Sequence, residues 1–154
     1  MPYEFVNTPI ERMNVDAIVN PTNMFMQFSD GLSARLAECA GPAMQQDCTK
    51  LAPLHADEIL ITQGYNLPAK WVFHVLVPQW IEQGEEAISL CYARILQDAV
   101  TQRIQSVAMP LLCCEQVGFP EERSRQLATE VIEAFLQKHP TLHIYIANEQ
   151  TPSA

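Results

Sequence analysis

The chain has 154 residues and a formal net charge of −9, from 9 basic and 18 acidic side chains. A chain of this length suits one domain with one hydrophobic core, and we expect residues 1–154 to form it. The acidic balance argues against nucleic-acid binding, which needs clustered Lys and Arg side chains. No apolar run approaches the ~20 residues that span a bilayer, so we expect no membrane partner.

The cysteines stand at irregular spacing, at positions Cys39, Cys48, Cys91, Cys113 and Cys114. No C-x-x-C pair and no ladder of His and Cys occurs, so the pattern predicts neither a disulfide framework nor a zinc site. We therefore expect reduced thiols, a cytoplasmic location, no metal and no cofactor. The N-terminus lacks a basic segment followed by an apolar stretch, which argues against a signal peptide.

Apolar runs and helical patterns alternate along the first half of the chain. Strands are expected at 3–6, 16–19, 58–62 and 71–77, and helices from 31 to about 41 and from 42 to 50. The first of these helices would be capped by Ser29 or Asp30 and would stop near Gly41. Only residues 63–70 separate the third and fourth strands, too few for a crossover helix, so these two should run antiparallel.

The second half continues the alternation. Ile88, Cys91, Ile95 and Ala99 recur on one helical face and predict an amphipathic helix over 86–102. A strand at 106–112, a helix beginning at 120–122, a strand at 142–147 and a frayed tail at 148–154 are expected to follow. Because most connections are β-α-β crossovers, the chain predicts a three-layer α/β/α sandwich with a mixed, mostly parallel central sheet.

The predicted sheet indicates where a ligand would bind. In open α/β sheets, ligands lie beyond the carboxyl ends of the parallel strands, where the strand order reverses. Two loops follow such strands, at 20–31 and 113–120. The sequence therefore predicts a small-molecule cleft between these loops. Because the chain lacks a basic cluster, an anionic ligand would have to be held by backbone N–H groups.

Four segments in order carry a family resemblance. They are VDAIVNPTN at 15–23, DG at 30–31 with AGP at 40–42, ITQGYNLPAK at 61–70 leading into VFHV at 72–75, and MP at 109–110 running to GFP at 118–120. The first is similar to VDAIVNAAN of the macrodomain family, and the third to its ITxGYxLPAK. On these segments the chain resembles macrodomains, which recognise ADP-ribose and in some members hydrolyse ADP-ribosyl bonds.

The resemblance implies ligand roles for residues of both loops. Asn23 matches an asparagine that contacts the distal ribose and supports catalysis, and Asp30 matches a carboxylate that positions or activates a water. The resemblance extends ligand contact to Asn20, Cys114, Glu115, Gln116, Val117, Gly118 and Phe119. The residues alone leave structural roles open. The asparagines suit a turn, Asp30 suits a helix N-cap, and residues 118–120 suit a turn before a helix.

Three departures from the family pattern fall where the ligand would bind. The segment MFMQFS at 24–29 replaces a glycine run that allows close backbone approach, and it is about three residues shorter than the family's loop. Glu115 replaces a glycine beside the diphosphate, and a carboxylate ~4 Å from a phosphate costs up to about 4 kcal/mol at an effective dielectric near 20. Pro9 stands where the family has the aspartate that binds the adenine amine.

Two functional hypotheses follow. The first is a divergent macrodomain that recognises ADP-ribose or an ADP-ribosylated target with weakened affinity, and in which Asn23 and Asp30 would carry any residual hydrolase activity. The alternative is a degenerate macrodomain that has lost this ligand and binds another small metabolite or serves as a protein-interaction scaffold. The segment 24–28 would either fill the cleft or fold over a ligand. His74, in the middle of a predicted strand, favours a hydrogen-bonded core histidine over a catalytic base.

Overall fold

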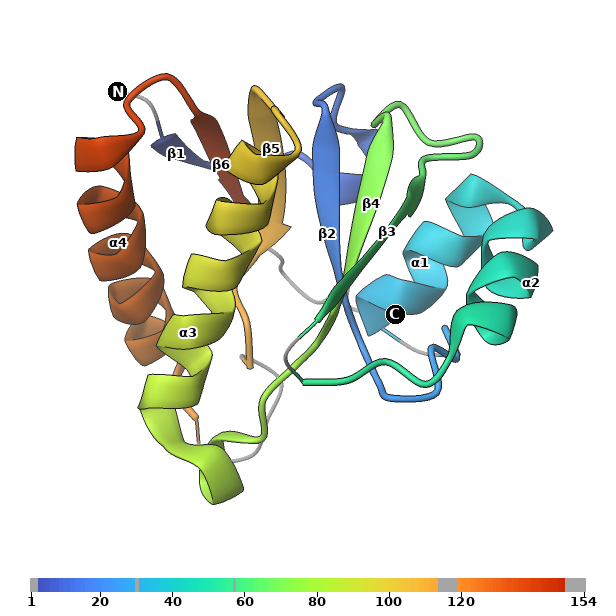
Figure 1. Ribbon diagram of the computed structural model, residues 1–154, viewed down its shortest axis with the longest axis horizontal. Helices are drawn as coiled ribbons and strands as arrows, with labels where there is room; N and C mark the ends of the chain where they lie inside the picture. Colours follow the sequence, from blue (N-terminus) through green and yellow to red (C-terminus); the bar gives the residue numbers. More distant parts are fainter. Residues whose placement is uncertain (1–2, 30, 57, 114–118, 149–154) are drawn as a thin grey trace.

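The computed structural model describes residues 3–29, 31–56, 58–113 and 119–148 (Figure 1). Its strands are β1 (Tyr3–Val6), β2 (Ala17–Thr22), β3 (Ile59–Gln63), β4 (Trp71–Leu76), β5 (Ser106–Pro110) and β6 (His143–Ala147). Its helices are α1 (Gly31–Ala40), α2 (Pro42–Leu51), α3 (Trp80–Thr101) and α4 (Glu121–Lys138), with a short 3-10 helix η1 (Ile10–Arg12). The expectations for Asp30, for residues 114–118 and for the tail beyond Asn148 fall outside the described residues.

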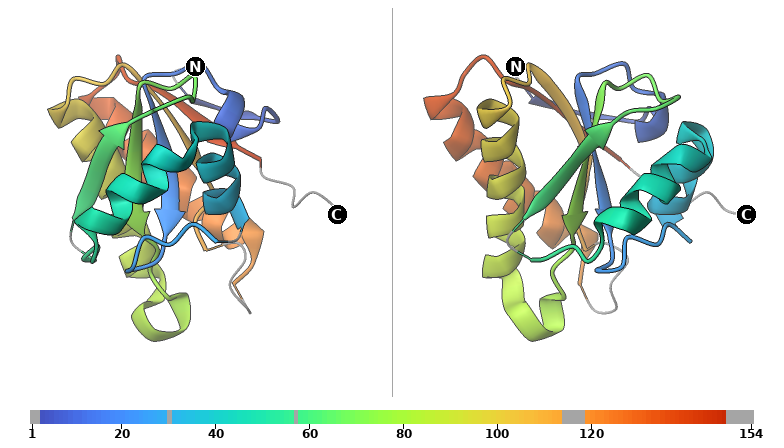
Figure 2. Two further views of the ribbon diagram at one scale, coloured as in Figure 1. Left: turned by 90° about the vertical axis from the view of Figure 1, so that its right-hand side faces the viewer. Right: turned by 45° about the vertical axis from the view of Figure 1, so that its right-hand side comes forward.

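The six strands form one sheet in the order β1-β6-β5-β2-β4-β3. All neighbouring pairs are parallel except β3 and β4, which are antiparallel, as the short link between them predicts. Helices α3 and α4 cover one face of the sheet, and α1 and α2 cover the other (Figures 1 and 2). The predicted three-layer α/β/α sandwich with a mixed, mostly parallel sheet is confirmed.

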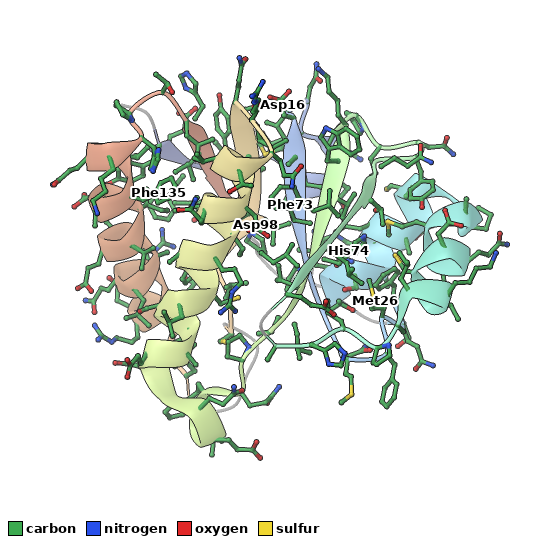
Figure 3. The ribbon with its side chains drawn as sticks, in the orientation of Figure 1. Asp16, Met26, Phe73, His74, Asp98 and Phe135 are labelled. Carbon is green, nitrogen blue, oxygen red and sulfur yellow. The ribbon has the colours of Figure 1, made fainter. Side chains whose placement is uncertain are left out.

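Successive strand residues point to opposite faces of the sheet and so build two cores. Val19 and Phe73 belong to the core under α3 and α4, whereas Ile18 and Val72 belong to the core under α1 and α2. Figure 3 shows this division around β4, with Phe73 toward α3 and the next residue, His74, toward α1 and α2. All five of these side chains are buried, and each large apolar one contributes about 1.5–3 kcal/mol by leaving water.

Two elements differ from the sequence-based expectation at the end that faces the predicted cleft. Strand β2 continues past Val19 to Thr22, because Asn20, Pro21 and Thr22 pair with β4. Strand β5 pairs only with Ala17 and Ile18, so at Pro21 strand β2 has a hydrogen-bonded neighbour on the β4 side alone. A proline, which lacks the backbone N–H, is tolerated at such an edge position.

Helix α3 begins at Trp80 rather than at Glu86, and it is interrupted at Gly84. The backbone there has φ 78° and ψ 179°, a conformation that glycine adopts without a Cβ clash. The break separates a first short segment from the amphipathic helix that the sequence pattern predicts. Within the described residues, no helix has the length and apolar character needed to cross a bilayer.

Candidate functional site

The strand order reverses between β2 and β5. The chain continues from β2 toward β3 and β4 on one side, and β5 and β6 lie on the other side. The segments that follow β2 and β5 therefore leave the sheet at adjacent carboxyl ends, at the lower edge of the sheet in Figure 1. This is the position where open α/β sheets bind ligands. The structure thus places the ends of β2 and β5, from which the two predicted loops depart, at the same edge.

The loop after β2 is organised around the side chain of Asn23. Its Oδ1 accepts hydrogen bonds from the backbone N–H groups of Phe25 (3.1 Å) and Gln27 (3.2 Å). Its Nδ2 donates to the carbonyl oxygen of Gln27 (2.9 Å). These contacts use both lone pairs of Oδ1 and one of the two Nδ2 hydrogens. Asn23 is exposed, and in this conformation it retains one N–H donor that no other described residue engages.

Some apolar side chains of this loop are buried in the core and others are exposed at the surface. Met26 is fully buried at φ 54°, and Phe28 is 7% exposed. The ring of Phe28 stacks on His74, with centroids 5.6 Å apart and planes 10° from parallel. Met24 and Phe25 are 47% and 62% exposed. Two residues of segment 24–28 therefore fill the core beneath the loop, and the other three, Gln27 included, remain at the surface (Figure 3 labels Met26).

A buried polar network lies under the same loop. His74 is fully buried, and its Nδ1 lies 3.0 Å from Asn20 Nδ2 and its Nε2 lies 2.9 Å from Thr62 Oγ1. Ser33 of α1 donates to Asn20 Oδ1 (2.8 Å), and Cys48 Sγ lies 3.6 Å from His74 Nε2. Burial lowers the pKa of His74 to about 4, so the ring is neutral at pH 7. The interpretation of His74 as a hydrogen-bonded core histidine agrees with this geometry.

Asn20, a predicted ligand residue, is engaged within the protein. The side chain is fully buried, and its carboxamide lies between His74 and Ser33.

The segment after β5 starts from a closed ring of three hydrogen bonds. The N–H of Leu112 donates to the hydroxyl of Tyr92 (2.7 Å), which lies on α3. The Tyr92 hydroxyl lies 2.8 Å from Ser124 Oγ, and Ser124 donates to the Leu112 carbonyl oxygen (2.5 Å). All three residues are buried. Both backbone polar groups of Leu112 are therefore fixed by side chains from the two helices on that face.

The described residues on either side of 114–118 are also buried. Cys113 has φ 68°, and its thiol donates to the Pro78 carbonyl oxygen at 3.2 Å. Phe119 is 5% exposed and packs against Trp80, with ring centroids 5.5 Å apart. The predicted ligand residues Cys114, Glu115, Gln116, Val117 and Gly118 lie outside the described residues, as does Asp30. Phe119 lies in the core under α3 and α4.

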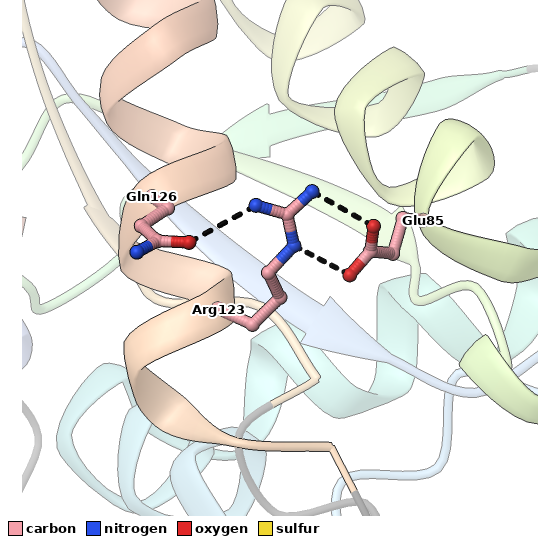
Figure 4. Close-up of polar contacts among 3 residues, drawn as sticks. All are labelled: Glu85, Arg123 and Gln126. Atoms are coloured by element: carbon pink, nitrogen blue, oxygen red, sulfur yellow. Dashed lines mark hydrogen bonds and ion pairs between the residues drawn. The ribbon is translucent and has the colours of Figure 1, made fainter.

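The arginine at the start of α4 is engaged within the protein (Figure 4). Arg123 donates to both carboxylate oxygens of Glu85 (2.6 and 2.8 Å) and to Gln126 (3.0 Å). These hydrogen bonds lower the pKa of Glu85, which follows the break at Gly84. The pair joins the first turn of α4 to α3. Among the described residues, no group of three His, Cys, Asp or Glu side chains could hold a metal ion.

Three residues that hold these loops were missed by the sequence reasoning, namely Gln45, Tyr92 and Ser124. Each binds backbone groups of a segment that is distant in the chain, and none belongs to a recognisable motif. The proximity of Gln45 to the β2 loop depends on how α2 packs, which periodicity does not reveal.

Comparisons with known proteins agree with this architecture. The profile of the Macro domain family matches residues 19–128. A macro domain-containing protein of Methanosarcina mazei is 37% identical over 133 residues, covering 84% of this chain and 71% of that protein. ADP-ribose glycohydrolase MACROD1 of Bos taurus is 30% identical, covering 84% of this chain, which spans only 41% of that protein. The Oceanobacillus iheyensis macrodomain with ADP shares the fold at a TM-score of 0.87 and 23% identity, covering 94% of this chain and 82% of that one.

Proposed function

Because this chain belongs to the macrodomain family, we propose that it recognises ADP-ribose, or a target carrying an ADP-ribosyl group, between the loops after β2 and β5. The observation that carries the proposal is the reversal of strand order between β2 and β5, in a chain whose family match includes both loops. The name of MACROD1, an ADP-ribose glycohydrolase, and the ADP held by the Oceanobacillus iheyensis macrodomain support this ligand class.

The proposed ligand contacts come from both loops. Asn23 donates its remaining N–H to an acceptor such as a ribose hydroxyl oxygen, and the segment 114–118 approaches the phosphates. Phe119 supports that segment from the core, and Asn20 supports the β2 loop through His74. In a hydrolytic reaction, Asp30 would hold the attacking water near the anomeric carbon.

We propose that the affinity is lower than an intact family site would give. Asn23 can donate to a ligand but cannot accept, because Phe25 and Gln27 occupy both lone pairs of its Oδ1. A missing hydrogen bond costs on the order of 1 kcal/mol, or about fivefold in affinity. Glu115 in place of glycine and Pro9 in place of aspartate remove further favourable contacts.

The engaged state of Asn23 also favours a second candidate function. The loop engages most of the hydrogen-bonding groups of its own asparagine and buries Met26 and Phe28 without a ligand. The alternative is therefore a degenerate macrodomain that binds another small metabolite or serves as a scaffold for a protein partner. A cytoplasmic location is part of either proposal and is consistent with the free thiols of Cys39, Cys48, Cys91 and Cys113.

Calorimetry with free ADP-ribose tests the proposal, with AMP and ribose 5-phosphate as partial ligands. We expect a Kd above about 1 μM for ADP-ribose and weaker binding of both fragments. Absence of any binding would overturn ADP-ribose recognition in favour of the alternative. A sub-micromolar Kd would contradict the weakened site.

The variant Glu115→Gly tests whether the Glu115 carboxylate or the β2 loop weakens the binding of ADP-ribose. If the carboxylate repels the phosphates, removing it tightens binding by at least tenfold, within the limit of about 4 kcal/mol given above. An unchanged Kd would show that the β2 loop limits binding instead.

For hydrolysis, release of ADP-ribose from a modified protein is measured for the wild type and for Asp30→Ala. Equal turnover would remove Asp30 from the mechanism.

A further inference from the structure

The side-chain amide of Gln45, on α2, binds the loop after β2 at two points. Its Oε1 accepts a hydrogen bond from the backbone N–H of Phe28 (2.9 Å), and its Nε2 donates to the carbonyl oxygen of Met26 (2.8 Å). Nε2 also lies 3.0 Å from Thr49 Oγ1, one helical turn further along α2. The carboxamide thus donates to Met26 and accepts from Phe28, much as a backbone segment of a neighbouring strand would.

The two backbone groups that Gln45 binds flank Gln27 on both sides. The N–H and the carbonyl oxygen of Gln27 are in turn bonded to the carboxamide of Asn23. A continuous set of hydrogen bonds therefore leads from α2 through the loop backbone to Asn23. The orientation of the Asn23 amide thus depends on the position of Gln27, and Gln45 binds the backbone on both sides of Gln27.

The backbone conformation of the β2 loop is not one that its residues favour, so the hydrogen bonds of Gln45 help to hold it. Met26 adopts φ 54°, the left-handed region, where a side chain is strained and glycine would be relaxed. Outside the Gln45 and Asn23 contacts, the backbone of Met24 is bonded to Leu54, whose N–H donates to the Met24 carbonyl oxygen at 2.8 Å. Without Gln45, the segment from Phe25 to Phe28 would lose two of the hydrogen bonds that oppose this strain.

We propose that Gln45 is a positioning residue for ligand recognition, which fixes the β2 loop so that the remaining N–H of Asn23 points in one direction. The inference rests on the proposed function of the cleft. A loop that is ordered before binding loses less conformational entropy when the ligand arrives. Gln45 therefore contributes to affinity without touching the ligand.

The test compares ADP-ribose affinity in three variants of the full chain. Gln45→Met keeps the length of the side chain and removes both hydrogen bonds, and we expect about tenfold weaker binding. Gln45→Glu keeps the acceptor for Phe28 N–H but loses the donor to Met26, and we expect a loss of about threefold. Gln46→Met, at the adjacent exposed position of α2, serves as the matched control and should bind like the wild type.

Hydrogen exchange of the unliganded protein supplies a readout that a general loss of stability would not reproduce. In Gln45→Met, the amides of Gln27 and Phe28 should exchange faster, while those of β5 and β6 keep their wild-type rates. Faster exchange across the whole sheet would overturn the inference.

The binding outcomes separate the two proposals. Equal Kd values for the wild type and Gln45→Met would overturn the role of Gln45 and leave ADP-ribose recognition standing. A wild-type protein that binds no ADP-ribose would overturn both.

Discussion

The loops after β2 and β5 leave the same edge of the sheet, yet they are held in different ways. The β2 loop is stabilised by its own Asn23 and by one half-buried side chain, Gln45. The segment after β5 begins at Leu112, whose N–H and carbonyl oxygen are bound by Tyr92 and Ser124 from two different helices. One loop is anchored near the surface, and the other is anchored inside the core.

The depth of the anchor decides what its loss would do. Water can replace a hydrogen bond at the exposed edge of the β2 loop, so a change there alters the loop more than the fold. Leu112, Tyr92 and Ser124 are at most 1% exposed, so a group that loses its partner there remains without water. Leaving such a buried group unsatisfied costs about 1–3 kcal/mol. Affinity can thus be adjusted through the β2 loop, whereas the start of the β5 segment belongs to the stability of the whole domain.

Acidification should produce the largest change in the free energy of unfolding, because it protonates His74, which is buried beneath the β2 loop. The folded-state pKa of about 4 lies below the ordinary value of 6.5, so protons bind preferentially to the unfolded chain. The contribution of His74 is complete above pH 6.5 and decreases as the pH falls toward 4, by about 3 kcal/mol in total. Urea unfolding over this range measures it. The variant His74→Gln should lack this part of the pH dependence of the free energy of unfolding. An equal pH dependence in the wild type and the variant would refute the contribution of His74.

Removing the Tyr92 hydroxyl should destabilise the domain by about 2 kcal/mol, because Leu112 N–H loses its acceptor in the core. The free energy of unfolding of Tyr92→Phe is measured in urea. Tyr3→Phe is the matched control, because the Tyr3 hydroxyl binds Glu133 at an exposed position. An equal loss in the two variants would show that burial does not distinguish the anchors.

The smallest effect is expected at the exposed ion pair between Glu85 and Arg123. Glu85→Gln weakens the contact with Arg123 and should leave the free energy of unfolding within error of the wild type, because water replaces exposed ion pairs. A measurable loss that disappears in high salt would show that this pair fixes the start of α4, and would place it with the core anchors.

Much of the fold follows from local patterns. The alternation of apolar runs and helical faces predicts each described strand and α-helix in order but not the 3-10 helix η1, and the short link at 63–70 predicts the antiparallel pair. The largest errors are the end of β2 and the start of α3. Strand β2 runs on through Pro21 because β4 supplies a partner there, and α3 starts early because Gly84 permits a break. Both depend on contacts or backbone angles that a hydrophobic pattern does not contain.

The candidate site was predictable only in part, for a physical reason. The sequence by itself determined the family, the order of the elements and the two loops that meet at the switch in strand order, since these depend on spacing and on short motifs. Only the tertiary structure decided that Asn20 is buried beside His74, that Asn23 binds its own loop, and that Gln45 holds that loop from α2. Hydrogen bonds between residues that are distant in the chain depend on how the helices pack on the sheet, and the sequence of one segment does not reveal this packing.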